Sequence, residues 1–401
     1  LKIQENHTFK FMVGMNKVGY KSEYNWSQIT QLIDYTNPQF NLATGTQTTG
    51  GDKNWDSQLG FFGRLNYNYK EKYLLEANVR RDASSKFPKD LRWATFPSFS
   101  AGWHLDKEAF MDFSKNFLDQ FKIRASWGSI GDQTVPNGLY VPTLSSSQTS
   151  WLISGAKPFQ FSTPAAVSSS IGWQNISTLD IGTDIRVLNN ALGLTVDWYQ
   201  RDTQGMIVPE AGLPTTYGTT APQGNFGSLR TKGIEFALDY NHTFSNGLRV
   251  NFVAITSNAI TKITKYGTVT SIDDWYVGKT YGEIWGYQTD RLFQKSDFVY
   301  NSPGDPAPAT TVVNGRTVYQ FADGNTPIQG KEILSGAGSS SSFKFGPGDV
   351  KFVDLNRDGE LDAGSRLLDD HGDLEIIGNS TPRYEYGLRL GADYKGVDLS
   401  V

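Results

Sequence analysis

The sequence contains no cysteine and only four histidines among its 401 residues. The missing cysteines exclude disulfide bonds, thiolate metal sites and cysteine nucleophiles from this stretch of chain. Charged residues are also scarce, at 19%, and they sum to a formal net charge of -4, so no nucleic acid is expected as a partner. No run approaches the roughly 18 consecutive apolar residues of a transmembrane helix.

Aromatic residues, by contrast, are abundant at 13%, and 41 glycines and 16 prolines indicate many turns. This composition favours β structure over helix. The mean hydropathy of -0.42 would ordinarily indicate a soluble protein. A membrane-spanning β-barrel is apolar only on alternate residues, however, so its wall also averages as polar.

Apolar and polar residues alternate with a period of two along residues 59–69 and again along residues 73–79. The short segment 70–72 between them predicts a tight turn, so the two runs form an antiparallel hairpin. Three further hairpins with the same pattern are expected at residues 179–198, 234–254 and 384–401.

The connections between these strands are very unequal in length. Within hairpins they are short turns, whereas between hairpins they range from roughly ten residues to far beyond the usual loop length. Outer-membrane barrels have short periplasmic turns, long extracellular loops and oblique strands of about 9 to 11 residues. The pattern therefore favours an all-β fold, a fragment of a large transmembrane antiparallel β-barrel with long extracellular loops.

A soluble β-sandwich or propeller would also produce alternating strands. Sandwich strands usually span about 5 to 6 residues, and no internal repeat of fixed length supports a propeller. The chain begins at Leu1 without an initiator methionine and stops at Val401 inside an alternating run. We therefore interpret residues 1–401 as part of one β-barrel domain of a longer protein.

Several motifs occur in a characteristic order along the chain. They are RLNYNY at 64–69, VRRDASSKF at 79–87, IRASWG at 123–128, NFGSLRTKGIE at 225–235 and GNSTPRY at 378–384. In these motifs and their order, nearly the whole chain resembles the SusC/RagA family of TonB-dependent outer-membrane transporters.

The resemblance implies a large barrel closed by an N-terminal plug domain and located in the outer membrane of a Gram-negative bacterium. It also implies import of oligosaccharides or oligopeptides, driven through TonB and assisted by a SusD-like surface lipoprotein. The chain would then be the middle to late barrel, and the plug, the TonB-contacting segment and the last strands would lie outside it.

Catalytic motifs are missing from the sequence. The histidines show no HExxH spacing, and no GxSxG motif places a serine nucleophile, so no enzyme is predicted. An alternative of another class is a secreted, soluble, calcium-stabilised β-sandwich protein that binds or cleaves carbohydrate.

A calcium loop is the clearest candidate metal site. Its spacing matches the first nine positions of an EF-hand loop, with Gly359 at the sharp turn and Ser365 in place of the final glutamate. The candidate ligands, which place oxygens on alternate residues, are Asp354, Asn356, Asp358, Glu360 and Asp362. The same residues also suit a surface turn without an ion.

Large aromatic residues in polar loops are candidate ligand-binding groups, because their rings offer much contact area at little entropic cost. The strongest candidates are Trp151, Trp173, Trp275 and Tyr276. The alternative role for each is packing of the loop aromatics against one another or against the lipoprotein. Charged residues on the polar side of the strands are expected by default to pair with one another, with contact to the plug as the alternative: Arg64, Glu76, Arg80, Arg124, Asp184, Arg186 and Glu235.

Overall fold

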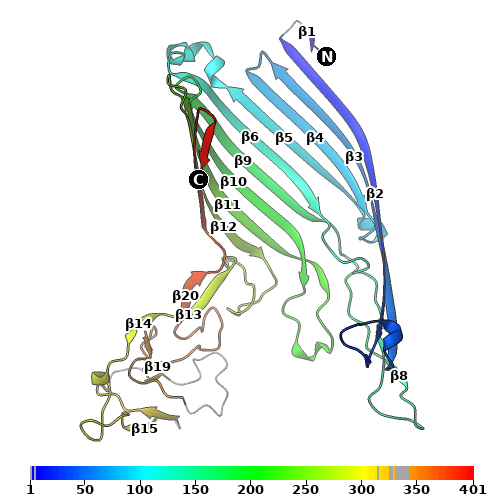
Figure 1. The fold of residues 1–401 in the computed structure, drawn as a ribbon, viewed down its shortest axis with the longest axis vertical. Helices are drawn as coiled ribbons and strands as arrows, with labels where there is room; N and C mark the ends of the chain where they lie inside the picture. Colours follow the sequence, from blue (N-terminus) through cyan, green and yellow to red (C-terminus); the bar gives the residue numbers. More distant parts are fainter. Residues whose placement is uncertain (1, 4–5, 314–315, 325–327, 330–342) are drawn as a thin grey trace. The chain divides into compact units, whose positions relative to one another are not determined.

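The computed structural model describes residues 2–3, 6–313, 316–324, 328–329 and 343–401 (Figure 1). The chain forms two compact units: the wall unit, Leu1–Ala259 with Tyr384–Val401, and the insert unit, Ile260–Arg383. Among the described residues, no helix has the length and apolar character needed to cross a membrane.

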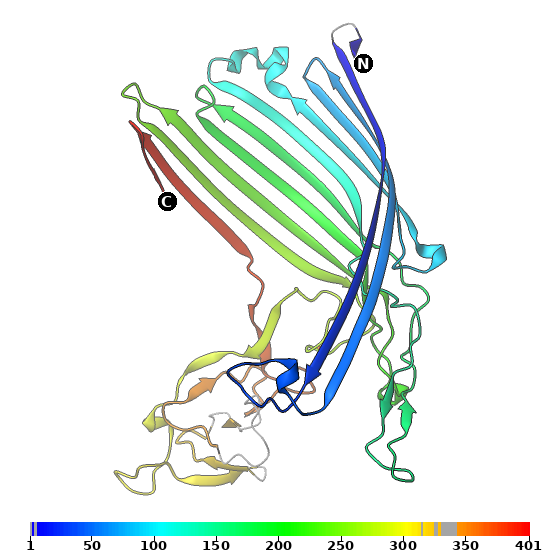
Figure 2. The same cartoon turned by 45° about the vertical axis from the view of Figure 1, so that its right-hand side comes forward.

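The wall unit is built on one antiparallel sheet of 12 strands, whose spatial order follows their order along the chain, with β7 and β8 left out between β6 and β9 and the insert strands left out between β12 and β21. Figures 1 and 2 show β2 to β12 side by side as one curved sheet. In spatial order the strands are β1 (Lys2–Ile3), β2 (His7–Ile29), β3 (Gln47–Tyr69), β4 (Tyr73–Ser84), β5 (Trp93–His104), β6 (Leu118–Asp132), β9 (Gln174–Val187), β10 (Leu192–Pro209), β11 (Gln223–Thr243), β12 (Arg249–Lys265), β21 (Tyr384–Tyr394) and β22 (Val397–Ser400).

All four predicted hairpins are confirmed, as β3–β4, β9–β10, β11–β12 and β21–β22. At the first turn Tyr69 pairs with Tyr73, and Lys70 and Glu71 have φ angles of 51° and 54°. Positive φ at both central residues gives a turn whose twist matches that of the strands. The long hairpin β2–β3 was not predicted, because alternation was recognised only from residue 59 onward, within β3.

Connection lengths separate the two ends of the sheet, as predicted. One end carries the short turns 70–72, 188–191, 244–248 and 395–396. The other end carries the longer segments 30–46, 85–92, 133–173, 210–222 and 266–383. Segment 105–117 is an exception, because it lies at the short-turn end and contains η3 (Leu105–Lys107) and η4 (Ala109–Ser114).

The sheet has one apolar face and one polar face. On β2, Phe11 and Val13 belong to the apolar face, and Val13 is 86% exposed. Lys10 occupies the polar face and pairs with Asn66 of β3. Within the described residues of the wall unit the apolar rows remain largely exposed, which excludes the predicted alternative of a sandwich with a second layer over this face.

The polarity of the faces inverts along β2. Beyond Met15, the positions of the apolar face are occupied by Lys17, Lys21 and Glu23, whereas Tyr20 and Tyr24 lie on the other face. The apolar part, from His7 to Met15, has close to the 9 to 11 residues that a tilted strand needs to cross a bilayer. The rest of this 23-residue strand therefore extends beyond the apolar band.

Short paired strands form the insert unit: β13 (Glu283–Tyr287) with β20 (Leu374–Asn379), β14 (Thr289–Leu292) with β18 (Val350–Phe352), β15 (Thr310–Val313) with β16 (Arg316–Tyr319), and β17 (Ile328–Gln329) with β19 (Glu360–Leu361). Phe293, Phe298 and Phe345 form one buried aromatic cluster of this unit. The remaining elements of the chain are β7 (Ser146–Gln148), β8 (Phe159–Phe161), η1 (Phe40–Leu42), η2 (Lys89–Leu91), η5 (Thr215–Tyr217) and η6 (Lys295–Asp297).

Candidate functional site

The predicted calcium loop lies between β18 and β19 of the insert unit. The carboxylate of Asp354 accepts hydrogen bonds from the backbone N–H of Arg357 at 2.5 Å and of Gly359 at 2.9 Å. Asn356 Oδ1 accepts another from the N–H of Asp358 at 3.0 Å. Gly359 has a φ of 90°, which strongly favours glycine, so the sharp turn predicted at this position is confirmed.

Asp373 joins the two ends of this loop. Its carboxylate is fully buried and accepts hydrogen bonds from the N–H of Leu355 at 2.7 Å and of Asp362 at 3.0 Å. Asp362 Oδ1 in turn accepts one from the N–H of Gly364 at 2.7 Å. A buried carboxylate is costly unless hydrogen bonds compensate it, so Asp373 makes the conformation of the loop specific.

The donor chemistry of the loop suits calcium, because hard cations prefer carboxylate and amide oxygens. In the part of the chain that the structure describes, no three acidic or histidine side chains converge on a point that could hold a metal ion. The side-chain oxygens of Asp354, Asn356 and Asp358 accept hydrogen bonds from backbone N–H groups of the loop. Calcium binding by this loop stays a prediction.

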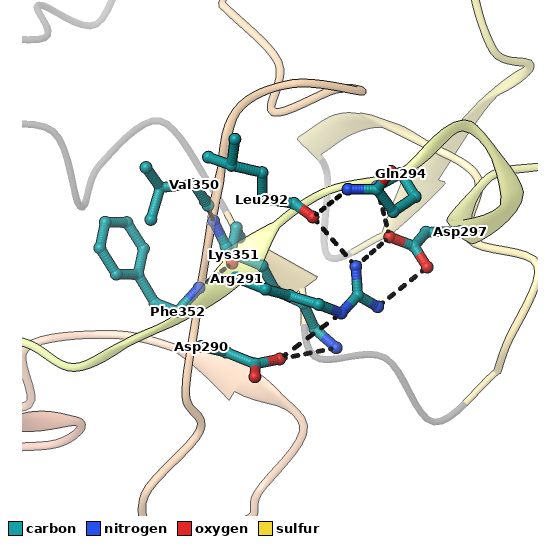
Figure 3. Close-up of polar contacts among 9 residues, drawn as sticks. Asp290, Arg291, Leu292, Gln294, Asp297, Val350, Lys351 and Phe352 are labelled. Carbon is teal, nitrogen blue, oxygen red and sulfur yellow. Dashed lines mark hydrogen bonds and ion pairs between the residues drawn. The ribbon is translucent and has the colours of Figure 1, made fainter.

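A charged cluster fixes β14 to its surroundings (Figure 3). The guanidinium of Arg291 donates two hydrogen bonds to the carboxylate of Asp297, at 2.6 and 2.9 Å. Asp297 also accepts the N–H of Gln294 at 2.7 Å. The pKa of Asp297 is lowered mainly by the hydrogen bond from Arg291. Lys351 Nζ of β18 lies 3.4 Å from the carboxylate of Asp290.

A cleft of about 810 Å³ opens beside this cluster. Its aromatic lining comes from Tyr319, Phe321 and Phe352. Polar side chains are added by Lys351, Asp354, Arg357 and Asp358. Alternation in the strands did not reveal this site, because its residues come from short strands and from turns that only the fold brings together. Aromatic surface with a few polar groups is suited to binding.

The predicted ligand-binding aromatics of the insert unit are packed within their own loop. Tyr276 is 6% exposed, donates a hydrogen bond to Glu283, and its ring centroid lies 5.1 Å from Lys279 Nζ. Burial, followed by the interaction with Glu283, raises the pKa of Tyr276. The Trp275 ring makes edge contacts with Tyr266 and Tyr281. The structure thus gives both residues the packing contacts that the alternative role requires.

The two predicted aromatics of the wall unit differ from each other. Trp173 donates a hydrogen bond to the carbonyl of Arg92 at 2.7 Å and packs against Phe87 and Phe96. Trp151 has a mostly exposed side chain. Both residues lie in segment 133–173, whereas Trp275 and Tyr276 lie in the insert unit. Ligand binding by each of the four stays a prediction.

Charged side chains pair on the polar face of the wall, as predicted. Arg124 lies 2.6 Å from the carboxylate of Asp197, 3.2 Å from that of Asp184 and 3.4 Å from that of Asp180. Gly182 leaves room for this cluster, because a Cβ atom there would lie 2.0 Å from Asp197 Oδ1. One arginine thus holds together three strands, β6, β9 and β10.

Further ion pairs continue this polar network. Arg186 lies 3.2 Å from the carboxylate of Asp239, and Arg64 lies 3.7 Å from that of Glu76. The alternating pattern singled out the arginines but not their partners Asp180, Asp197 and Asp239. Their positions on the polar side of alternating strands were a usable signal, but the pairing register was not available from the sequence.

A groove of about 670 Å³ runs over the polar face. Small residues of β5 and β6 line it, among them Ser100, Gly102 and Ser126. Lys10 of β2 and Lys122 of β6 contribute positive charge to its walls. This surface offers hydrogen-bonding groups to water or a polar molecule along the sheet.

The sequence model of one protein family, described as TonB dependent receptor-like, beta-barrel, matches residues 2–338 of this chain. TonB-dependent receptor P3 of Formosa agariphila is 27% identical over 380 residues, covering 94% of this chain and 34% of that protein. TonB-dependent receptor SusC of Bacteroides thetaiotaomicron is 29% identical over 268 residues, covering 64% of this chain and 26% of that protein. The chain thus spans about a third of the length of the curated relatives that it matches.

Solved structures show the same fold. The RagAB peptide importer in its open-open state superimposes with a TM-score of 0.73 at 17% identity, over 100% of this chain and 38% of that one. The closed-closed state of RagAB gives a TM-score of 0.68 at 18% identity, over 100% of this chain and 39% of that one. The curved sheet described above is therefore a segment of a large outer-membrane barrel wall.

Proposed function

Since the chain belongs to the family of TonB-dependent receptor-like β-barrels, we propose that the whole protein imports oligomeric nutrients across the outer membrane of a Gram-negative bacterium, using energy delivered through TonB. The family itself consists of outer-membrane transporters and receptors, not enzymes. The observation that carries the proposal is the family match over residues 2–338, combined with an apolar band of bilayer height on the wall.

Oligosaccharides or oligopeptides are the proposed substrates, and a SusD-like surface lipoprotein is the proposed partner. The likeness to SusC and to the RagAB peptide importer supports both the proposed substrates and the proposed partner. In this mechanism the long segments at one end of the sheet capture the substrate together with the lipoprotein. The paired charges of the polar face hold the wall rigid while the plug rearranges.

The proposal is tested by deleting the gene in its host and measuring growth on defined oligosaccharides and on defined oligopeptides as sole nutrient. Loss of growth on one class, restored by the wild-type gene, is the expected result. The tagged receptor should also co-purify with a lipoprotein from detergent-extracted outer membranes. Unchanged uptake of every oligomer by the deletion strain, or recovery of the full-length protein in the aqueous fraction, would contradict the proposal.

We further propose that calcium stabilises the loop from Asp354 to Asp362, held by oxygens of Asp354, Asn356, Asp358, Glu360 and Asp362. Bound calcium would hold this segment of the insert in one conformation. Adding calcium to the chelator-treated receptor is expected to raise the melting temperature of the insert, and Asp358→Ala should remove that increase. Asp305→Ala, at an acidic position outside the loop, serves as the control. An equal calcium response in both variants would refute calcium binding here.

A further inference from the structure

The apolar face of the wall contains a hollow of about 490 Å³, formed by strands β3 to β9. Its floor consists of small side chains, Ala77 of β4, Ala101 of β5 and Ala125 of β6. Ala101 and Ala125 are directly paired across their two strands. Below, this feature is called the apolar hollow.

Bulky side chains surround this floor. Phe99 and Trp127 are stacked, with ring centroids 6.2 Å apart and an interplanar angle of 13°, and they form one border. Leu75, paired with Ala101, forms another, and Leu65 and Leu179 also line the hollow. The rim residues are exposed on the apolar face, so the hollow opens to the surroundings of the barrel and not to its interior.

An aromatic row lies next to the hollow, on the side of the short turns. Tyr69, Tyr73 and Trp103 occupy successive strands, and each ring centroid is 6.2 Å from the next. Trp103 follows Ala101 by two residues along β5, a rise of about 6.8 Å. Amphipathic aromatic rings lie at the level of lipid headgroups, so the hollow lies just inside the hydrocarbon.

Polar groups at this level are suited to a headgroup. Tyr73 and Trp103 donate hydrogen bonds to Glu108 at 2.7 and 3.1 Å, and Lys72 Nζ lies 3.1 Å from the same carboxylate. These hydrogen bonds, first that of Tyr73, lower the pKa of Glu108 to about 2. Lys107 lies 3.0 Å from Glu71. The ends of these side chains provide both signs of charge, as a zwitterionic headgroup requires.

We propose that the apolar hollow binds one acyl chain of a phospholipid from the periplasmic leaflet, with its headgroup at the level of Tyr73, Trp103 and Lys72. Short turns mark the periplasmic side of outer-membrane barrels. The hollow is continuous with the apolar band that faces the bilayer. A flexible acyl chain can follow its contour and fill it, whereas lipids packed against a flat surface would leave it empty. The inference rests on the outer-membrane location of the family and is independent of what the receptor imports.

The test is native mass spectrometry of the full-length receptor, purified in detergent and incubated with phosphatidylethanolamine. The variant Ala101→Leu with Ala125→Leu fills the hollow while keeping the surface apolar. The matched control, Ala254→Leu with Ala392→Leu, adds the same bulk to the apolar face on β12 and β21. Heat-modifiable gel migration verifies that all three proteins fold.

The expected result is one phospholipid fewer on the Ala101/Ala125 variant than on the wild type, with no loss in the control. Equal phospholipid retention in the wild type and both variants would overturn the proposal. So would a change in oligomeric state without loss of lipid, since the hollow would then be a contact between copies. Retention of lipopolysaccharide in place of phospholipid would refute the assignment to the periplasmic leaflet.

Discussion

Both units expose large apolar side chains, but they bury their cores differently. The wall unit leaves whole rows such as Phe11, Val13 and Leu75 exposed, and its polar face carries paired charges. The insert unit has an aromatic core around Phe293, and it also buries the hydrogen-bonded carboxylate of Asp373. A side chain that is exposed on the apolar band of the wall therefore contacts hydrocarbon, whereas one exposed on the insert contacts water. Exposure of an apolar side chain is therefore favourable on the apolar band of the wall and unfavourable on the insert.

The largest effect is expected from the insert core. Phe293 is 1% exposed, and Phe293→Ala should lower the free energy of unfolding of the insert by about 3 to 5 kcal/mol, because it leaves a cavity. The wall should remain assembled, as measured by heat-modifiable gel migration, while limited proteolysis cuts the insert. Loss of the wall together with the insert would show that the two units fold as one.

Matched arginine substitutions compare the solvents of the two units directly. Val13 of the wall is 86% exposed and Val312 of the insert is 66% exposed. Val13→Arg should cost about 2 to 4 kcal/mol, because a charge on the lipid face is desolvated. Val312→Arg should change stability by only about 0.5 kcal/mol. Urea titrations of the receptor refolded in lipid vesicles measure the loss of stability in each variant. Equal losses for Val13→Arg and Val312→Arg would show that the two exposed sites do not differ in their surroundings.

A smaller effect is expected on the polar face. Arg124→Met leaves Asp180, Asp184 and Asp197 without their shared cation and should destabilise the wall by about 1 to 3 kcal/mol. Arg249→Met removes an exposed pair with Asp393 and should cost less than about 1 kcal/mol. The same urea titrations provide the measurement. Similar values for the two variants would mean that the Arg124 cluster is no stronger than a surface pair.

The smallest effect is a pH dependence confined to the insert. Because Arg291 lowers the pKa of Asp297 in the folded insert, this carboxylate stabilises the fold above its ordinary pKa of 3.8. The contribution is lost as the pH falls below that value. The melting temperature of the insert should therefore decrease between pH 5 and pH 3, and Asp297→Asn should reduce the decrease. An identical pH profile for Asp297→Asn would refute the assignment.

The wall was predictable from the sequence because each of its features is local. Alternation with period two and tight turns such as 70–72 fix the hairpins, and order along the chain fixes their neighbours. The charged clusters were only half predictable. Arg124 was recognised on the polar side, but its contact with Asp197 depends on register across β6, β9 and β10.

The insert was much less predictable, because its contacts join residues that are distant in the sequence. Gly359 and its turn were found from spacing alone, since a left-handed conformation depends on a single residue. The cleft beside Tyr319 and Phe352 was missed, because short strands carry too few residues to show a period. The burial of Tyr276 was not predictable either, since a polar loop sequence does not reveal that its ring is buried.

The central claim is that the apolar face of the wall contacts hydrocarbon. The stretch contains no native cysteine, so single cysteines placed at Val13 and Leu75, and at Asn66 and Ser100 on the polar face, can each carry a fluorophore. In the full-length receptor reconstituted in vesicles, lipids brominated on their acyl chains should quench the probes at Val13 and Leu75 and leave those at Asn66 and Ser100 bright. Quenching of the polar-face probes alone, or of none, would contradict the account.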